Sequence, residues 1–403
     1  MYKLILSLAL KNAFLRLSRT ILVISMIGVS MSMMISLEGL YDGMTQNMVE
    51  KSKRSDSGEI SIYNKNYRIT ESLNDTIKNA DQIGEVLSKR SDIQAVSLRL
   101  KAQGLLATAR KSAFCSAIGI DLQEEEQFGK FSEFLQEGTL KLDKRYILLG
   151  SELAKTLKVR IGSKLIFSTQ DKSKEINSIA FRVGGIVQTN NISLDKSAVY
   201  VQKEQLRTFL GLDKQEAMQI AIRSNSSELL THLQAEYKNL EVKSFLQLYP
   251  MMQQMQEIMV IFNSITFLIV MSVVFIGIMG VMYVSVLDRV REFGIMQSIG
   301  MSYSLIRTQI FIESLSVALL GYVFGAVLAL LMLGYLHVDG LDLSEFADGL
   351  ESFGYSAVLY ATVKAEYFVT TFFAIVGASL LSVLLPLRKI KKMSVIEATK
   401  VEI

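Results

Sequence analysis

Few residues of this 403-residue chain combine in patterns that support catalysis. Its two histidines, His232 and His337, lie far apart in sequence, and its single cysteine, Cys115, has no neighbour that would lower the pKa of a thiol. This composition disfavours a His/Cys metal site and excludes an intrachain disulfide. The acidic run at residues 124–126 is typical of a solvated turn, and no G-x-x-x-x-G-K-[ST] motif marks a P-loop. We therefore assign no catalytic, cofactor-binding or metal-binding residue.

The elements that position the remaining residues are dominated by apolar segments. Half of the residues are hydrophobic, 20% are charged, and the mean hydropathy is +0.31. A net charge of +4 is too small to indicate a nucleic-acid partner. Four runs contain no charged residue, and each is long enough for a transmembrane helix: Thr20–Leu37, Ile258–Leu287, Ser314–Leu336 and Tyr367–Leu387. A purely soluble enzyme is therefore disfavoured.

Two of the four runs have unusual lengths. The first is longer than the apolar part of a signal peptide, and no A-x-A cleavage pattern follows it, so we expect an uncleaved helix. The second exceeds the length of a bilayer crossing by about 10 residues. We expect that excess to form a stalk that continues into an external domain.

Basic residues flank the apolar runs asymmetrically. Lysines and arginines precede the first run, follow the fourth and occupy the link between the second and third, whereas acidic residues dominate between the third and fourth. The positive-inside rule then places both termini in the cytoplasm and the large domain outside. Small residues recur every four positions in the first and third runs, for example Gly28 and Ser32, and Gly321 and Gly325. Such stripes suit either packing within one chain or a dimer interface, and we favour packing within the chain.

The chain between the first two runs alternates strand-like and helix-like segments, which predicts an α+β domain. The fold class is thus a membrane α-helical protein with four transmembrane helices and a large α+β extracytoplasmic domain inserted between helices 1 and 2. Before the domain we expect a juxtamembrane helix at 1–19 and the first transmembrane helix at 20–37. The domain occupies 38–257, with a β-rich lobe at about 111–200. After it we expect a second helix with its stalk at 258–287, a cytoplasmic coupling segment at 288–307, a third helix at 308–336, a short external loop at 337–366, a fourth helix at 367–387 and a tail at 388–403.

The link between the second and third helices carries the most specific pattern. Residues 288–301 read DRVREFGIMQSIGM and are followed by IFIE at 310–313. This resembles the R-E-[IF]-G-I-x-[KR]-[AS]-[IL]-G-[AM]-S and F-x-E pattern of FtsX/MacB-type permeases of ABC transporters, although Gln297 replaces the usual base. Stretches at 117–121, 149–164 and 386–398 also resemble family patterns. The similarity covers essentially the whole chain and lies nearest to the LolC/LolE-like lipoprotein-releasing permeases.

The resemblance implies a mechanotransmission permease at the inner membrane, with its large domain in the periplasm. Such a permease lacks its own ATPase site and needs no cofactor in this chain, because ATP and Mg are bound by a separate ABC ATP-binding subunit present in two copies. It also implies a second permease copy or a homologous permease, contact with membrane lipid, and no nucleic acid. The expected substrate is a lipoprotein, with or without a periplasmic carrier.

The same resemblance implies where ATPase coupling takes place. The residues expected to carry it are Arg291, Glu292, Phe293, Gly294, Met296, Gln297 and Gly300. We expect Arg291 and Glu292 to pair with the ATPase and the two glycines to permit close approach. The apolar side chains Val290, Phe293, Met296 and Ile299 would anchor the segment in an ATPase groove or at the lipid surface. The alternative is an amphipathic connector that merely ties two helices.

Lipoprotein extraction would require an apolar opening toward the outer leaflet. The outer ends of the first two helices supply candidate gate residues, which are Met33, Met34, Leu37, Ile261, Phe262 and Ile265. Met and Phe suit acyl chains of varied length, but ordinary helix packing also accounts for these residues. Two other functions stay open: a MacB-like exporter that works with an adaptor and an outer-membrane channel, and an FtsX-like regulator of a cell-wall hydrolase. No proline precedes Pro250 in the external region, so a carrier-binding hook cannot be located.

Overall fold

The computed structural model describes residues 17–189, 191–226, 228–346, 349–350, 355 and 357–392. The chain divides into two compact units. The membrane unit comprises Met1–Met44, Met255–Leu343 and Val358–Ile403, and the sheet unit comprises Thr45–Gln254 and Ser344–Ala357. Of the juxtamembrane helix expected at 1–19, residues 1–16 lie outside the described residues, and Leu17 is the first residue of the first long helix.

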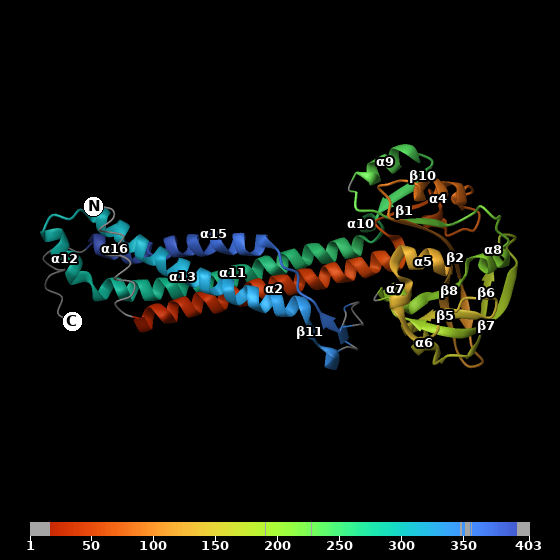
Figure 1. The fold of residues 1–403 in the computed structure, drawn as a ribbon, viewed down its shortest axis with the longest axis horizontal. Coiled ribbons are helices and arrows are strands. Elements are labelled where there is room, and N and C mark those ends of the chain that lie inside the picture. Colours follow the sequence, from red (N-terminus) through yellow and green to blue (C-terminus); the bar gives the residue numbers. More distant parts are fainter. Residues whose placement is uncertain are drawn as a thin grey trace. The chain divides into compact units, whose positions relative to one another are not determined.

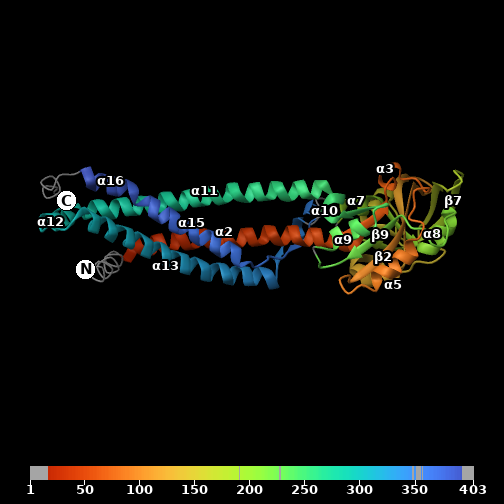
Figure 2. The same ribbon diagram turned by 90° about the horizontal axis from the view of Figure 1, so that it is seen from above.

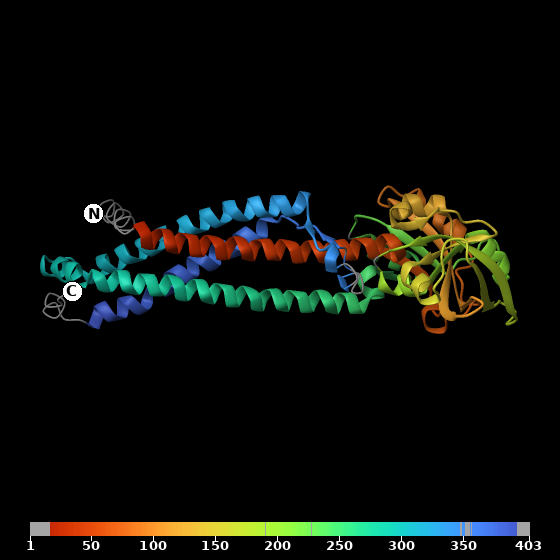
Figure 3. The same ribbon diagram turned by 90° about the horizontal axis from the view of Figure 1, so that it is seen from below.

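Within the described residues, the membrane unit contains four long apolar helices (Figure 1). They are α2 (Leu17–Ser52), α11 (Pro250–Asp288), α13 (Tyr303–Val338) and α15 (Ala365–Ser382), and each is long and apolar enough to span a bilayer. Figure 2 and Figure 3 show them running roughly lengthwise alongside one another. The short helix α12 (Val290–Ser298) connects α11 to α13, and α16 (Leu384–Lys392) follows α15. The first three apolar runs are therefore continuous helices, whereas the fourth, expected at 367–387, is helical in two pieces because α15 ends at Ser382 and α16 begins after Val383.

Three of these helices are longer than the apolar runs that predicted them. The first run ends at Leu37, but α2 continues to Ser52, and α13 begins at Tyr303 rather than at residue 308. Hydropathy marks only the part of a helix that lies in hydrocarbon, whereas backbone hydrogen bonds continue the helix into polar surroundings. The 39-residue α11 spans the predicted crossing and its stalk in one element.

Small residues allow close helix packing inside the membrane unit. A Cβ on Gly28 of α2 would lie 2.4 Å from a ring carbon of Phe324, and one on Gly325 of α13 would lie 2.9 Å from the Cα of Gly28. These two glycines thus bring α2 and α13 together within one chain, as lipid-exposed helices without a hydrophobic drive require. Farther along α2, Gly39 and Gly43 meet the carbonyl oxygens of Thr362 and Tyr360 in the segment that leads into α15.

The sheet unit is built on a sheet of ten strands. Their order is β10-β1-β9-β2-β3-β8-β5-β7-β4, with β6 pairing β2 and β7. The strands are β1 (Ile60–Asn64), β2 (Ala95–Ala107), β3 (Ser112–Ile120), β4 (Leu135–Gly138), β5 (Tyr146–Gly150), β6 (Lys164–Gln170), β7 (Ile176–Val187), β8 (Ala198–Gln202), β9 (Gln219–Arg223) and β10 (Leu240–Ser244). Among these ten strands, β3–β8 and β5–β7 pair in parallel and the other pairs are antiparallel.

The long strand β2 joins the two halves of this sheet. Its first part pairs with β9 and its second part with β3 and β6. The strands within residues 111–200, which the sequence indicated as an inserted lobe, therefore continue the same sheet through β2. A single 13-residue strand can hold both halves because it exchanges partners along its length.

Short helices cover the sheet: α3 (Tyr67–Thr70), α4 (Ala80–Ser88), α5 (Leu122–Gly129), α6 (Ser151–Leu157), α7 (Ile192–Ser197), α8 (Lys203–Leu210), α9 (Leu229–Glu236) and α10 (Phe245–Leu248). Strand β10 ends at Ser244, because a capping box between Ser244 and Gln247 starts α10. The acidic run at 124–126 is not a solvated turn. It lies in α5, capped by Asp121, and Glu125 is only 1% exposed.

Candidate functional site

The connection between α11 and α13 is a short helix with tight turns at both ends. Arg289 follows the last residue of α11 and precedes α12. The chain leaves α12 through Gly300, whose φ of +94° favours glycine, and the Met301 amide donates back to the Met296 carbonyl at 3.0 Å. At the start of α13 the Tyr303 hydroxyl donates to the Leu387 carbonyl of α16 at 3.0 Å. The connection is thus a folded element rather than a loop.

One face of α12 is buried in the core of the membrane unit. Val290 and Phe293 are 6% and 2% exposed, and Gly294 is also buried. Phe293 belongs to the same apolar cluster as Val286 of α11 and Ile306 of α13. The opposite face carries Arg291 and Ile295, which are exposed, and Ile299 beyond the helix end is 82% exposed. The outer face of α12 therefore exposes charged and apolar side chains, while its inner face packs into the core of the membrane unit.

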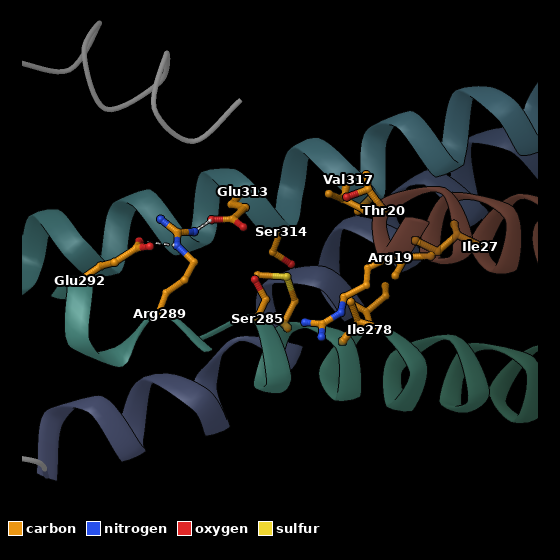
Figure 4. A pocket seen from close by; sticks show the side chains of 14 residues that line it. Arg19, Thr20, Ile27, Ile278, Ser285, Arg289, Glu292, Glu313, Ser314 and Val317 are labelled. Atoms are coloured by element: carbon orange, nitrogen blue, oxygen red, sulfur yellow. Dashed lines mark hydrogen bonds and ion pairs between the residues drawn. The ribbon is translucent and has the colours of Figure 1, made fainter. Parts of the chain in front are cut away.

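Arg289 fixes the start of α12 through ionic contacts in two directions (Figure 4). Its guanidinium Nη1 donates to Glu313 Oε2 of α13 at 3.0 Å, and its Nε donates to Glu292 Oε2 of α12 at 2.9 Å. The guanidinium also lies over the Phe293 ring, 5.2 Å from its centroid. The side chains of Arg289 and Glu313 are only 13% and 7% exposed. A single arginine therefore ties together the connector, the aromatic anchor and the following helix.

A cavity of about 120 Å³ adjoins this ion pair, between α2, α11, α12 and α13. Figure 4 shows Arg289, Glu292 and Glu313 at one end of it and Ile27 at the other. Arg19 of α2 also lines the cavity and pairs with Asp288 of α11 at 2.6 Å. The full lining is Arg19, Thr20, Val23, Ile27, Ile278, Val281, Met282, Ser285, Arg289, Glu292, Glu313, Ser314, Val317 and Ala318. Polar groups thus meet at the end of the bundle that holds α12, where each cation has an acidic partner.

The structure separates the residues that the sequence indicated for coupling. Arg291 is exposed on α12, and Gln297 and Met296 are half-buried. Glu292 is largely exposed but bonds Arg289 of its own chain, so its carboxylate is already engaged. Gly300 makes the turn after α12 with a φ of +94°, and no atom of this chain lies within 4 Å of where its Cβ would be, so the position is open on its outer side.

The expected apolar anchors need a correction. Val290 and Phe293 are buried in the membrane unit and do not face outward, whereas Met296 packs against the same core but stays half-buried. The helical repeat explains this result, since residues three apart share one face and that face is needed to close the core. The exposed apolar side chains are Ile299, as expected, and Ile295, which the sequence reasoning omitted.

The gate residues fall into two groups. Met33 on α2 and Ile261, Phe262 and Ile265 on α11 are between 52% and 63% exposed. Leu37 is half-buried, and Met34 is only 4% exposed, so Met34 belongs to helix packing rather than to an open surface. The part of α11 before Val274 has no buried residue, whereas a stripe from Val274 to Val286 is buried at intervals of four.

Sequence reasoning missed three charged residues that the structure brings together: Arg19, Arg289 and Glu313. The available signal was the acid of the F-x-E motif, since an ionisable residue inside an apolar helix is costly and needs a partner. In the sheet unit, burial raises the pKa of the Cys115 thiol to about 12, which opposes thiolate chemistry there. Among the described residues no group of three or more His, Cys, Asp or Glu side chains could hold a metal ion.

Comparisons with known proteins cover both units. The MacB-like periplasmic core domain matches residues 20–240, and the FtsX-like permease C-terminal domain matches residues 264–395. The lipoprotein-releasing system transmembrane protein LolC of Buchnera aphidicola subsp. Schizaphis graminum is 25% identical over 330 residues, which is 76% of each chain.

Two solved structures that are similar to this chain are external domains of transporters. The periplasmic region of MacB from Actinobacillus actinomycetemcomitans is 18% identical, with a TM-score of 0.33, and the match covers 50% of this chain and 91% of that one. The extracellular domain of the noncanonic ABC-type transporter YknZ from Gram-positive bacteria is 13% identical, with a TM-score of 0.32, and the match covers 46% of this chain and 98% of that one.

The periplasmic core domain model alone covers more than half of the chain, and the permease model accounts for most of the rest. Together with the four apolar helices, these matches establish that the chain belongs to the FtsX/MacB family of ABC transporter permeases.

Proposed function

We propose that this chain couples ATP hydrolysis in a separate ABC ATP-binding subunit to the extraction of lipoproteins from the outer leaflet of the inner membrane. Two copies of the ATPase and a second permease, identical or homologous, complete the assembly. The chain itself contributes no ATPase site and no cofactor. Both termini and α12 face the cytoplasm, and the sheet unit faces the periplasm. A periplasm-specific reporter fused after Gly340 should be active and one fused after Gly300 silent, and reversed activities would refute this orientation.

The single observation that carries the coupling role is the way α12 is held. Arg289 bonds Glu313 of α13 and Glu292 of α12 while Phe293 packs in the core, so an ion pair and an aromatic contact join α12 to α13. A force applied to Arg291 and Ile295 on the outer face would therefore reach α13 directly. A flexible connector that merely tied two helices would not need a buried ion pair, which is costly unless its geometry is maintained.

The substrate role is supported by the apolar surface of α11. Its first half exposes a row of large apolar side chains, Ile258, Ile261, Phe262, Ile265, Leu268 and Ile269. In a bilayer this surface contacts lipid, a second permease or an acyl chain, and all three are apolar. Acyl chains that leave the outer leaflet would meet α11 here if its first half faces the periplasm.

Similarity to LolC favours lipoprotein release over export, because LolC is a lipoprotein-releasing protein and the match spans three quarters of both chains. One observation favours the alternative of a MacB-like exporter, namely the match of residues 20–240 to the MacB-like core domain. The two functions differ in where the substrate lies before transport: in the membrane for release, and in the periplasm for export.

A photocrosslinker placed along α11 distinguishes the two. In cells, a benzophenone side chain at Phe262 should capture an acylated protein, and ATP turnover should remove that adduct. Val284 is the matched control, since it is exposed on the same helix at the opposite end and should capture no acylated protein. Capture of phospholipid alone at Phe262, with a soluble substrate captured by the sheet unit, would replace lipoprotein release with export.

A further inference from the structure

The end of α2 departs from the ordinary α-helix as it enters the sheet unit. Residues Lys53–Ser57 form a π-helical turn directly after Ser52, and the chain then turns at Gly58 with φ +65°. A Cβ on Gly58 would lie 2.2 Å from the Ile222 carbonyl oxygen, so only glycine fits this turn. The turn buries Ser55, Asp56 and Ser57. π-Helical turns frequently mark functional positions in helices.

Asp56 is the only acidic residue of this turn, and it contacts two other elements. Its Oδ1 pairs with Lys101 Nζ of β2 at 2.9 Å, and its backbone carbonyl accepts a hydrogen bond from Arg99 of β2. Its Oδ2 accepts a hydrogen bond from the Tyr249 hydroxyl. Tyr249 immediately precedes Pro250, the first residue of α11. One carboxylate therefore joins the end of α2, the central strand and the start of α11, all within the sheet unit.

A second carboxylate completes the cluster. Arg99 is 2% exposed and bonds Glu125 of α5 in a bidentate manner, with Nε to Oε1 and Nη2 to Oε2 both at 2.6 Å. The charges of Asp56, Glu125, Arg99 and Lys101 sum to zero. A neutral buried network with this many hydrogen bonds is rigid, and the loss of one member leaves another charge without compensation.

Neighbouring contacts reinforce the same end of α2. Arg54 donates to the Gly129 carbonyl at 2.8 Å and pairs with Glu133 at 2.6 Å, while Asn191 donates to the Ser52 hydroxyl at 3.0 Å. These contacts involve α2 and the sheet unit only. The Asp56–Tyr249 bond differs from them because Tyr249 immediately precedes α11 in the chain.

We propose that Asp56 is the joint through which α2 and α11 move the external domain as one body. This role rests on the proposed function, since it supplies the step after the force has entered at α12. Asp56 is a positioning residue: it holds the ends of the two long helices against β2, so that a shift of either helix displaces the sheet. Without the Asp56 contacts, the ends of α2 and α11 would shift independently of each other. A shift of one helix would then not displace the external domain.

A matched control exists in the same unit. Glu216 is also a buried carboxylate, 4% exposed, and pairs with Lys172 at 2.9 Å and with the Thr76 hydroxyl at 2.9 Å. Within the described part of the chain, the hydrogen bonds and ion pairs of Glu216 go to Thr76, Lys172 and the Asp213 amide, none of which lies on α2 or α11. Glu216→Gln and Asp56→Asn therefore each remove one buried charge, and only Asp56→Asn loosens the proposed joint.

The test measures distances between spin labels in the full-length chain in lipid nanodiscs, on a Cys115→Ala background. Labels at the exposed positions Gln46 on α2 and Gln254 on α11 report the two helix ends, and the exposed Lys89, which directly follows α4, gives a reference within the domain. Asp56→Asn should broaden the distances from Gln254 to Gln46 and to Lys89, whereas Glu216→Gln should leave both narrow. Tyr249→Phe removes only the hydroxyl contact and should broaden the same distances without loss of fold.

The outcomes separate this proposal from the proposed function. The proposed role of Asp56 would be refuted if the two distance distributions stayed unchanged in Asp56→Asn and Tyr249→Phe. It would also be refuted if Glu216→Gln broadened them as much as Asp56→Asn does. With the cognate ATPase added, the wild-type chain should show a nucleotide-dependent shift of the Gln254–Lys89 distance that Asp56→Asn loses while ATPase binding persists. Retention of that shift in Asp56→Asn would also overturn the joint. Failure of the wild-type chain to bind any ABC ATPase would instead defeat the proposed function, and the distances without nucleotide would still decide the joint.

Discussion

Arg289 and Glu313 form an ion pair between the turn that precedes α12 and the apolar helix α13, with 3.0 Å between Nη1 and Oε2. Both side chains are largely buried, so each charge depends on the other for compensation. Because Arg289 also holds Glu292 and covers Phe293, the orientation of α12 follows from this pair. This ion pair therefore connects α12, which is the surface proposed to bind the ATPase, to α13 in the membrane unit.

Glu313→Gln should release α12 from α13. The substitution leaves the Arg289 guanidinium with Glu292 alone, and breaking a buried pair costs about 3–5 kcal/mol of stability. We expect a lower melting temperature in detergent and weaker stimulation of the ATPase by the permease. The double variant Arg289→Gln/Glu313→Gln removes both charges and should be less destabilised than Glu313→Gln alone. Equal stability of the wild type and Glu313→Gln would show that the pair contributes little.

Arg291→Glu should weaken ATPase binding without altering the fold. Arg291 is exposed on the outer face of α12, so reversing its charge removes an attraction at the proposed contact and changes no buried group. We expect a several-fold rise in Kd for the ATPase, steeper at low salt, as measured by binding to the permease in nanodiscs. Arg307→Glu is the control, because Arg307 is exposed on α13 outside α12. If both variants bind equally well, α12 is not the contact surface.

Gly43→Ala should separate α2 from the segment before α15. The added Cβ would lie 1.9 Å from the Tyr360 carbonyl oxygen, which is backbone and cannot move aside alone. Overpacking of this kind costs about 1–3 kcal/mol, measured as a loss of thermal stability. Gly377→Ala on α15 has nothing within 4 Å of the new Cβ and should be neutral or stabilising. Similar melting temperatures for Gly43→Ala and the wild type would contradict the close approach.

Low pH should destabilise the sheet unit in part through Glu216. Burial raises the pKa of this carboxyl, but hydrogen bonds from Lys172, the Asp213 amide and Thr76 outweigh it, so the net pKa lies below the ordinary value of 4.5. A group with a depressed folded pKa contributes stability that is present above pH 4.5 and is lost as pH falls through the folded pKa. Glu216→Gln should therefore flatten the fall in unfolding temperature below pH 4.5. If the unfolding temperature of Glu216→Gln falls below pH 4.5 as steeply as that of the wild type, Glu216 makes no such contribution.

The membrane part of the fold could be predicted from sequence because its signal is local. Four uncharged runs predicted four helices, and the four-residue spacing of small residues within the runs was compatible with either packing within the chain or a dimer interface. The structure places Gly28 against Gly325 within one chain. The ends of the helices could not be predicted in this way, since α2 extends to Ser52 through residues that are no longer apolar. Hydropathy reports the solvent around a helix and not its hydrogen bonds.

The candidate site was only partly predictable for a related reason. The pattern at 288–301 located α12, but the helical repeat alone could not say which face would close the core, so Phe293 was expected outside and lies inside. Glu125 illustrates the same limit, since an acidic run looks solvated until Arg99, 26 residues earlier, is placed beside it. Long-range ion pairs of this kind depend on the tertiary fold and produce no periodic pattern in the sequence.

Release of an acylated protein from proteoliposomes tests the central claim most directly. The vesicles would contain this chain, its partner permease and its ATPase, with a lipoprotein in the outer leaflet. We predict release that requires hydrolysable ATP, falls in Glu313→Gln and Asp56→Asn, and persists in Arg307→Glu and Glu216→Gln. Lipoprotein that stays in the membrane during rapid ATP hydrolysis, while a soluble periplasmic substrate is exported, would contradict the account.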